Sequence, residues 1–201
     1  MTPRVIGLAG GTASGKTTAA RGLLAALGDR AVLLTHDRYY RSLPEGRNPA
    51  MWNFDHPDAL ETNLLATHID ELVAGREVAI PTYAFDRHQR EPTSEWTRIE
   101  PRPIIVVEGI LVLADEGLRT RMHHRVFVQT PDDVRLVRRI RRDVAERGRG
   151  VDDILAQYMA TVRPMHEQFV APSRQHAHLV LDGTRPVQEL VARLSAVVAG
   201  A

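Results

Sequence analysis

The glycine-rich segment at residues 10–17 is the part of the sequence whose residue types and spacing most clearly predict chemistry. It reads Gly-Gly-Thr-Ala-Ser-Gly-Lys-Thr and matches the P-loop pattern G-x-x-x-x-G-K-[ST], between an apolar run and a helical run. Glycines let the backbone curl so that successive N–H groups point at phosphate oxygens, and the helix N-terminus adds partial positive charge. The motif predicts a nucleoside triphosphate site, in which Lys16 reaches the β- and γ-phosphates and the Thr17 hydroxyl binds Mg²⁺.

The basic residues narrow the class of P-loop protein. The sequence contains 26 Lys and Arg residues, and Lys16 is its single lysine. A Ras-like GTP switch recognises guanine through an Asn-Lys-x-Asp element, which needs a second lysine. The sequence therefore argues against a GTP switch and favours a P-loop enzyme of another kind.

Two carboxylates follow apolar runs that predict strands. Asp37 comes shortly after residues 31–35, and Glu108 directly follows residues 104–107. The carboxyl ends of parallel strands face the ligand crevice, so both side chains should point toward the phosphates. Glu108 is expected to bind Mg²⁺, and Asp37 to accept a proton from an attacking hydroxyl group. The alternative for each is an acid that caps the following segment.

The elements that must position these residues alternate along the chain. Five short apolar runs predict strands at 5–9, 31–35, 104–107, 125–128 and 178–181. Helical patterns cover 16–27, 58–74, 132–146, 151–170 and 186–199. Thr130 and Pro131 suit the N-cap and the first position of the third helix. The pattern predicts an α/β fold: a five-stranded parallel sheet of the P-loop NTPase type with helices on both faces.

Two segments interrupt this alternation. Residues 36–57 are rich in polar and aromatic residues and are expected to form a loop. Residues 76–103 contain four prolines and two short extended pieces, at 78–85 and 95–99, which predict a β-hairpin lobe. A chain of 201 residues is long enough to bury one core with a small lobe, so we expect residues 1–201 to form a single domain.

Composition excludes several classes of function. The formal net charge is +1, with 43% hydrophobic and 25% charged residues, which argues against a protein that coats nucleic acid. The chain has no cysteine, which excludes disulfides, zinc–thiolate sites and cysteine catalysis. No apolar stretch is long enough to span a bilayer, and no signal-peptide core is evident, so we expect a cytoplasmic protein without a membrane partner.

Residues 135–150 form an arginine-rich segment, which holds seven arginines and the two acids Asp143 and Glu146. At helical spacing, four of the arginines share one face: Arg135, Arg138, Arg139 and Arg142. Glycines at 148 and 150 then interrupt the pattern, which predicts a hinged, helical lid whose guanidinium groups bind γ-phosphoryl oxygens. A solvated basic face and a nucleic-acid patch are the alternatives, although no aromatic residue interleaves with the arginines.

Several further blocks give the chain a specific resemblance. In order they are Gly10–Thr18, Asp37–Arg41, Asn53–Ala59, Pro81–Arg90, Glu108–Leu111, Arg138–Arg149, Gln157-Tyr158 and Ala177–Gly183. With these blocks the sequence resembles the uridine/cytidine kinases, in the uridine kinase–phosphoribulokinase group of P-loop kinases. The blocks Asn53–Ala59 and Pro81–Arg90 are the most diagnostic, because other P-loop kinases lack them.

The resemblance implies an activity. Enzymes of this family transfer the γ-phosphoryl group of ATP, with Mg²⁺, to the 5′-hydroxyl of uridine or cytidine, giving UMP or CMP in pyrimidine salvage. The substrates are small molecules, GTP is a second candidate donor, and the resemblance further implies a homotetramer with feedback inhibition by pyrimidine triphosphates. Two alternatives stay open: a related kinase for another hydroxyl acceptor, such as ribulose phosphate or pantothenate, and a nucleotide-binding regulatory or RNA-binding module.

The resemblance also implies roles for individual residues. The ATP-binding positions are Gly10, Gly11, Thr12, Ala13, Ser14, Gly15, Lys16, Thr17 and Thr18. Asp37, Lys16, Arg142 and Arg147 are the expected catalytic residues, and Thr17 and Glu108 the expected metal ligands. Asp55 is expected to bind the ribose hydroxyls, because two O–H donors need an ionised acceptor. The remaining nucleoside-binding positions are Tyr40, Phe54, Tyr83, Phe85, His88, Arg139, Arg149 and Gln157. Asp55 as a helix cap, Tyr83 and Phe85 as hairpin core, and His88 and Gln157 as surface residues are the simpler alternatives.

Overall fold

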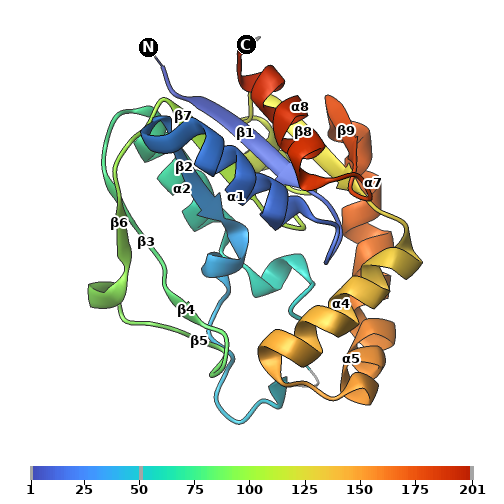
Figure 1. Ribbon diagram of the computed structural model, residues 1–201. Helices are drawn as coiled ribbons and strands as arrows, with labels where there is room; N and C mark the ends of the chain where they lie inside the picture. The colour runs from blue at the N-terminus through green and yellow to red at the C-terminus, as the bar shows by residue number, and fades with distance from the viewer. Residues whose placement is uncertain (1, 50–51, 200–201) are drawn as a thin grey trace.

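A five-stranded parallel sheet forms the centre of the molecule, as the apolar runs predict (Figure 1). The computed structural model describes residues 2–49 and 52–199. Its strands are β1 (Arg4–Ala9), β2 (Ala31–Thr35), β7 (Ile104–Glu108), β8 (His124–Gln129) and β9 (Leu179–Asp182). They lie in the order β2-β7-β1-β8-β9, and every neighbouring pair is parallel. This order puts β1 and its following loop at the middle of the sheet.

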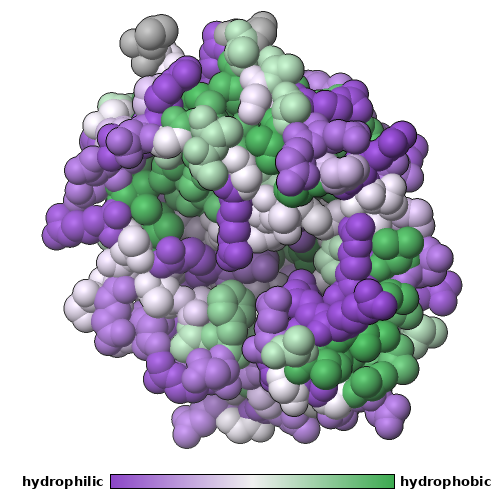
Figure 2. All heavy atoms as spheres, in the orientation of Figure 1, coloured by the Kyte–Doolittle hydropathy of each residue, from purple (hydrophilic) through white to green (hydrophobic). Residues whose placement is uncertain are grey.

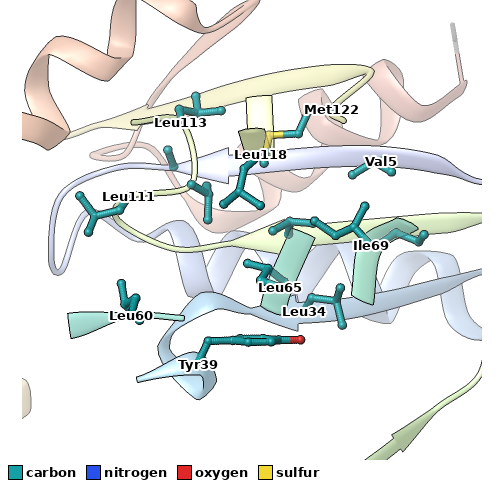
Figure 3. Packing of buried hydrophobic residues seen from close by; sticks show 14 of the residues in the cluster. Val5, Leu34, Tyr39, Leu60, Leu65, Ile69, Leu111, Leu113, Leu118 and Met122 are labelled. Atoms are coloured by element: carbon teal, nitrogen blue, oxygen red, sulfur yellow. The ribbon is translucent and has the colours of Figure 1, made fainter. Parts of the chain in front are cut away.

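Helices cover both faces of the sheet. One face packs against α1 (Lys16–Leu27) and α8 (Val187–Ala199), and the opposite face packs against α2 (Thr62–Val73) and α3 (Glu116–Arg119). Successive residues of β1 alternate between the two cores: Val5 lies with Leu65 and Ile69 of α2, and Ile6 with Leu23 of α1. Figure 3 shows the first of these cores. Burial on both faces explains why the strands are continuously apolar.

The second helix begins later than its pattern predicts. Residues Pro57–Ala59 form a separate 3₁₀ turn, and α2 starts only at Thr62. Between the two, Leu60 is extended and forms an isolated antiparallel bridge with Tyr40. This contact ties the predicted loop 36–57 to α2. That loop also contains a 3₁₀ turn, His36–Tyr39, and its residues 50 and 51 lie outside the described part of the chain.

The predicted helix 151–170 is longer and less regular than expected. It begins as α5 (Val151–Gln157), continues through π-helical turns at 158–162 and 166–170, and passes through α6 (Arg163–Met165) and α7 (Ala171–Ser173). A 3₁₀ turn at residues 174–176 ends the segment. Each π-helical turn comes just before an α-helical turn that contains a proline, which has no backbone N–H and clashes with the preceding turn. The wider turns accommodate the two prolines without ending the helical path.

Helix α4 (Asp132–Arg147) is the arginine-rich element, and its predicted cap is wrong. Pro131 occupies the cap position, and among the described residues no side chain caps the helix. The Thr130 hydroxyl instead donates to the carbonyl of Ser14 at 2.9 Å. Thr130 therefore joins the start of α4 to the P-loop, a contact between distant residues that local cap rules do not anticipate.

The segment 76–103 forms a small β-lobe beside the sheet, although as two pairs of strands and not one hairpin. Strand β3 (Val78–Ile80) pairs with β6 (Thr97–Ile99), and β4 (Tyr83–Ala84) pairs with β5 (Gln89–Arg90), both antiparallel. Two arginines fix the lobe against the end of β2. Arg38 donates to the carbonyl of Pro81 at 2.6 Å, and Arg90 donates to the carbonyls of Tyr39 and Tyr40 at 2.9 and 2.8 Å.

Candidate active site

The P-loop connects β1 to α1 and folds as its glycines predict. Gly10, Ala13 and Gly15 have positive φ angles of 150°, 56° and 97°. A backbone that alternates in this way forms a concave nest of N–H groups suited to an anion. Because α1 begins at Lys16, the positive end of its dipole adds to the same nest. The predicted ATP-binding residues 10–18 thus lie together, with Thr18 exposed on the first turn of α1.

Lys16, Thr17 and Glu108 meet at the carboxyl edge of the sheet. The Thr17 hydroxyl donates to Glu108 Oε1 at 2.8 Å, and Lys16 Nζ lies 3.6 Å from the same oxygen. Burial raises the pKa of Glu108, Lys16 opposes that rise, and the charge of Asp37 adds to it. Both partners of this ion pair are almost fully buried. Burying charged groups is energetically costly, and bound ions of opposite charge would offset part of that cost.

This donor set suits Mg²⁺. The ion prefers oxygen ligands and is usually held by one or two carboxylates together with substrate phosphates. Thr17 and Glu108 supply one hydroxyl and one carboxylate that already touch each other beside the phosphate nest. Their chemistry and position therefore fit the predicted metal site.

Asp37 and Asp55, at opposite ends of the loop 36–57, lie in the same electrostatic environment. Burial raises the pKa of Asp55, Arg139 and Lys16 oppose that rise, and the charge of Asp37 reinforces it. The alternative that Asp55 caps the following 3₁₀ turn is wrong, because His56 Nδ1 accepts from the Asp58 N–H at 3.2 Å and provides that cap. Asp55 therefore remains available to the site.

Five rings from the loop and the β-lobe form one aromatic cluster. Its members are Tyr40, Phe54, Tyr83, Phe85 and His88. Phe54 stacks on His88 with centroids 4.9 Å apart, Tyr40 contacts Phe54 and Tyr83 at 5.8 and 5.5 Å, and Tyr83 meets Phe85 at 5.1 Å. Two carboxylates lie near this cluster. Burial, together with the negative charges of Asp37 and Asp55, raises the pKa of Tyr40 far above its usual value. The sequence therefore predicted residues that the fold does bring together.

Two members of the aromatic cluster have unusual local structure. The Tyr83 hydroxyl is buried and has no hydrogen-bond partner in residues 2–49 and 52–199. His88 has a positive φ of 53°, which few residues other than glycine adopt. Burial lowers the pKa of His88, and the nearby charge of Arg149 lowers it further. An orphaned hydroxyl and a backbone held in a costly conformation are both typical of ligand sites.

Helix α4 turns two of its arginines inward. Arg135 and Arg139 are buried, so the alternative of a solvated basic face is wrong for them, whereas Arg141 and Arg147 are exposed. Apolar residues lie on the outer surface of α4, α5 and the π-helical turn that follows α5: Val137, Val144, Val151, Leu155 and Met159 are exposed (Figure 2). A helix that buries arginine and exposes valine reverses the usual amphipathic arrangement. The anionic side of the site, with Asp55 beside Arg139, accounts for this reversal.

The arginines of this segment link the P-loop to the nucleoside-side residues. Arg139 donates to the Thr12 hydroxyl at 3.1 Å and to Gln157 Oε1 at 2.9 Å. Arg149 donates to the same Gln157 oxygen at 2.7 Å. Arg142, by contrast, donates to Asp143 at 2.8 Å. Gln157 is thus a shared acceptor inside the site and not a simple surface residue.

The structure places two residues of the arginine-rich segment differently from the sequence prediction. Asp143, for which the sequence predicts no role, is completely buried and contacts four arginines. Arg135, predicted to lie on the lid face that binds γ-phosphoryl oxygens, instead lies under the P-loop, where a Cβ added at Gly11 would be 2.6 Å from its Nη1. The sequence did contain a signal for the position of Asp143. An acid in the middle of an arginine run has several basic partners within one helical turn.

The fold and the site define a P-loop phosphotransferase. A P-loop follows the central strand of a parallel sheet, Glu108 ends the adjacent strand β7, Asp37 follows β2, and an arginine-rich helix and a β-lobe flank the site. The family model of the Phosphoribulokinase / Uridine kinase family matches residues 5–189. The chain belongs to this family and is a uridine kinase-type P-loop kinase, a transferase.

Curated relatives cover most of the chain. The uridine kinase of Chloroflexus aggregans is 50% identical over 184 residues, which span 90% of this chain and 87% of that protein. The uridine kinase of Halobacterium salinarum is 44% identical over 178 residues, or 88% and 78% of the two chains. That of Streptococcus thermophilus (strain LMD-9) is 42% identical over 182 residues, or 89% and 85%.

Solved structures share the fold at low sequence identity. A possible uridine kinase from Bacillus stearothermophilus superposes with a TM-score of 0.63 at 14% identity and covers 90% of each chain. Phosphoribulokinase from Rhodobacter spheroides gives a TM-score of 0.63 at 16% identity, covering 92% of this chain and 74% of its own. Within residues 2–49 and 52–199, no helix is long and apolar enough to cross a membrane.

Proposed function

We propose that this protein transfers the γ-phosphoryl group of ATP to the 5′-hydroxyl of uridine or cytidine, giving UMP or CMP and ADP. One observation carries the proposal: Tyr40, which belongs to the aromatic cluster with Phe54, Tyr83, Phe85 and His88, lies close enough to Asp37 and Asp55 for their charges to raise its pKa. A nucleoside needs flat apolar walls for its base and an acceptor for its ribose hydroxyls. The names of the curated relatives support the same substrate class.

The proposed binding of ATP, the phosphoryl donor, is supported by the positive charge on that side of the site. Lys16 and the P-loop N–H groups would receive the β- and γ-phosphates, and Arg142 and Arg147 of α4 would bind the γ-phosphoryl oxygens. Thr17 and Glu108 would hold Mg²⁺. When bound, Mg²⁺ neutralises charge that develops on the phosphate oxygens. Planar guanidinium groups suit the equatorial oxygens of the transferring group, because they offer two parallel donors.

The acceptor side rests on polar groups that the nucleoside would satisfy. Asp55, half-buried with a raised pKa, would accept hydrogen bonds from both ribose hydroxyls. The buried Tyr83 hydroxyl and the His88 imidazole would meet the edge of the base. Either imidazole nitrogen donates or accepts, according to tautomer, so His88 is compatible with both uracil and cytosine.

Asp37 would act as the general base. It lies in the turn after β2, at the same sheet edge as Glu108. As the 5′-oxygen forms its bond to the γ-phosphorus, the bond to the β–γ bridging oxygen breaks, ADP leaves and the hydroxyl proton passes to Asp37. A positioned base of this kind typically contributes ~10²–10⁴-fold in rate.

An acceptor panel tests the proposal. The protein is incubated with ATP and Mg²⁺, and with uridine, cytidine, ribulose 5-phosphate or pantothenate in turn, while ADP is measured. We expect acceptor-dependent ADP with the two nucleosides only. Absence of ADP above background with both nucleosides would contradict the proposal, and turnover with another acceptor would assign the protein to a different kinase activity of the same fold.

Four further properties are proposed on family resemblance alone. They are a role in pyrimidine salvage, a cytoplasmic location, a homotetrameric state and feedback inhibition by pyrimidine triphosphates. Repeating the panel with GTP in place of ATP compares the two candidate donors.

A further inference from the structure

Asp143 on α4 is a completely buried acid that divides four arginines between its two oxygens. Oδ1 lies 2.8 Å from Arg142 Nε and 3.4 Å from Arg147 Nη1. Oδ2 lies 3.6 Å from Arg139 Nε and 3.8 Å from Arg149 Nη1. The first pair contains the arginines proposed for the triphosphate, and the second pair contains those proposed for the nucleoside. One carboxylate is thus shared by the two substrate sides.

The contact between Oδ2 and Arg139 is incomplete. Asp143 Oδ2 and Arg139 Nε are both buried, and neither has a hydrogen-bond partner in the described part of the chain. They face each other at 3.6 Å, just beyond a normal hydrogen bond. A buried donor and acceptor without partners are costly, and a charge-assisted bond between them is favourable. A movement of ~0.5 Å would bring the two atoms within hydrogen-bond distance.

Arg139 connects this contact to both substrate sides. Its two terminal nitrogens bond the P-loop through Thr12, at 3.1 Å, and the nucleoside side through Gln157, at 2.9 Å. Its Nε faces Asp143. Movement of Arg139 toward Asp143 therefore moves a group that is bonded both to Thr12 of the P-loop and to Gln157, the acceptor that Arg139 shares with Arg149.

We propose that Asp143 is a positioning residue that couples the binding of ATP to the binding of the nucleoside, an inference that rests on the proposed function. When phosphates draw Arg142 and Arg147 away from Oδ1, the charge of Asp143 is left to Arg139 and Arg149. Arg139 then closes onto Oδ2 and is held in place for the nucleoside. Binding of either substrate thus tightens binding of the other, since such coupling is reciprocal.

The test is a cycle of binding measurements by titration calorimetry. The dissociation constant of a non-hydrolysable ATP analogue with Mg²⁺ is measured with and without saturating uridine. For the wild-type protein we expect uridine to tighten binding of the analogue about fivefold or more. Asp143→Asn keeps the size of the side chain but removes its charge, and should bring this ratio close to one. Glu146→Gln, an exposed acid on the same helix, is the matched control and should keep the wild-type ratio.

The ratio of the dissociation constants without and with uridine separates coupling from a merely structural role. A structural defect would weaken binding of the analogue equally in both conditions and leave the ratio unchanged. Arg139→Lys is the second variant, in case Asp143→Asn fails to fold. A lysine cannot bond Thr12, Gln157 and Asp143 together, so it should also lose the coupling. Uridine binding with no coupling in the wild type, or wild-type coupling in a folded variant, would overturn this inference alone. No uridine binding to the wild type would instead contradict the proposed function, and the inference with it.

Discussion

At the scale of the residue, the single lysine of the chain stands where its shape matters most. Lys16 is nearly buried, with its ammonium 3.6 Å from Glu108 at the first turn of α1. A compact ammonium on a flexible stem fits inside a tight backbone loop, whereas a guanidinium is wide and planar. Elsewhere in the site the basic residues are arginines, whose planar guanidinium groups have room to donate two parallel hydrogen bonds. Size as well as charge therefore distinguishes the two kinds of basic residue here.

Lys16→Arg tests this distinction, because it keeps the charge and changes the shape. We expect the turnover number to fall by ~10²-fold or more, as when one preorganised donor to a transition state is lost. The measurement is steady-state ADP formation with saturating uridine. A turnover number within a factor of about three of wild type would show that the P-loop needs only a positive charge at this position.

Asp37→Asn tests the general base separately from binding. The amide keeps the shape of the side chain but cannot take up the hydroxyl proton. The turnover number should fall ~10²–10⁴-fold. The dissociation constant of the non-hydrolysable ATP analogue should change little, because Asp37 follows β2 and lies outside the P-loop. Near-normal turnover would remove Asp37 from the role of base.

At the scale of the element, α4 supports the P-loop from beneath. Arg135 is buried under Gly11, where it donates to the carbonyl of Thr130 at 3.2 Å and to Asp132 at 2.5 Å. Thr130 in turn donates to Ser14. The loop that binds phosphate and the helix that carries the arginines are therefore packed as one unit.

Gly11→Ala tests that packing. The added Cβ would lie 2.6 Å from Arg135 Nη1, so the buried guanidinium or the loop must shift. Overpacking of this kind typically costs ~1–3 kcal/mol of unfolding free energy, and the shift should also weaken binding of the ATP analogue. Gly117→Ala on α3, whose nearest contact is the tip of Asp115 at 3.2 Å, is the control. Equal unfolding free energies and ATP-analogue affinities for the two variants would contradict the close packing.

Elements that depend on local pattern were predictable, and those that depend on distant contacts were not. The strands were found because they are continuously apolar, as fits β1 and β7, which are almost entirely buried at the middle of the sheet. The start of α2 was misplaced because Leu60 bridges to Tyr40, which no helical pattern reveals. The burial of Asp143 was only partly predictable, because three of its arginine partners lie on the same helix but Arg149 lies beyond the end of α4. The residues of the aromatic cluster were predicted to meet because of the family resemblance and not because of their spacing.

At the scale of the whole molecule, buried histidines make stability depend on pH. His36 is almost completely buried between β2 and α2, with Nε2 3.2 Å from the Thr62 hydroxyl, and burial lowers its pKa to about 4. Burial likewise lowers the pKa of His166 to about 4. A histidine of this kind is neutral in the folded protein but takes up a proton when unfolded below pH ~6.5. Its contribution is therefore complete above pH ~6.5 and is lost progressively as the pH falls toward about 4.

The expected result is a fall in the free energy of unfolding between pH 7.5 and pH 5, to which each of the two histidines contributes ~2 kcal/mol. Urea unfolding at the two pH values measures it. In His36→Gln, which cannot titrate, the difference between the two pH values should shrink by about that amount. An unchanged difference in this variant would show that His36 does not control the pH dependence.

If the proposed function is right, the 5′-hydroxyl of a pyrimidine nucleoside receives the γ-phosphoryl group of ATP. The decisive measurement follows the γ-phosphoryl group of labelled ATP with uridine and with 5′-deoxyuridine, which keeps the base and the ribose diol but lacks the reacting hydroxyl. We predict labelled uridine 5′-monophosphate from uridine, and from 5′-deoxyuridine competitive inhibition without any labelled nucleotide. Labelled product from 5′-deoxyuridine, or none from uridine, would contradict the account.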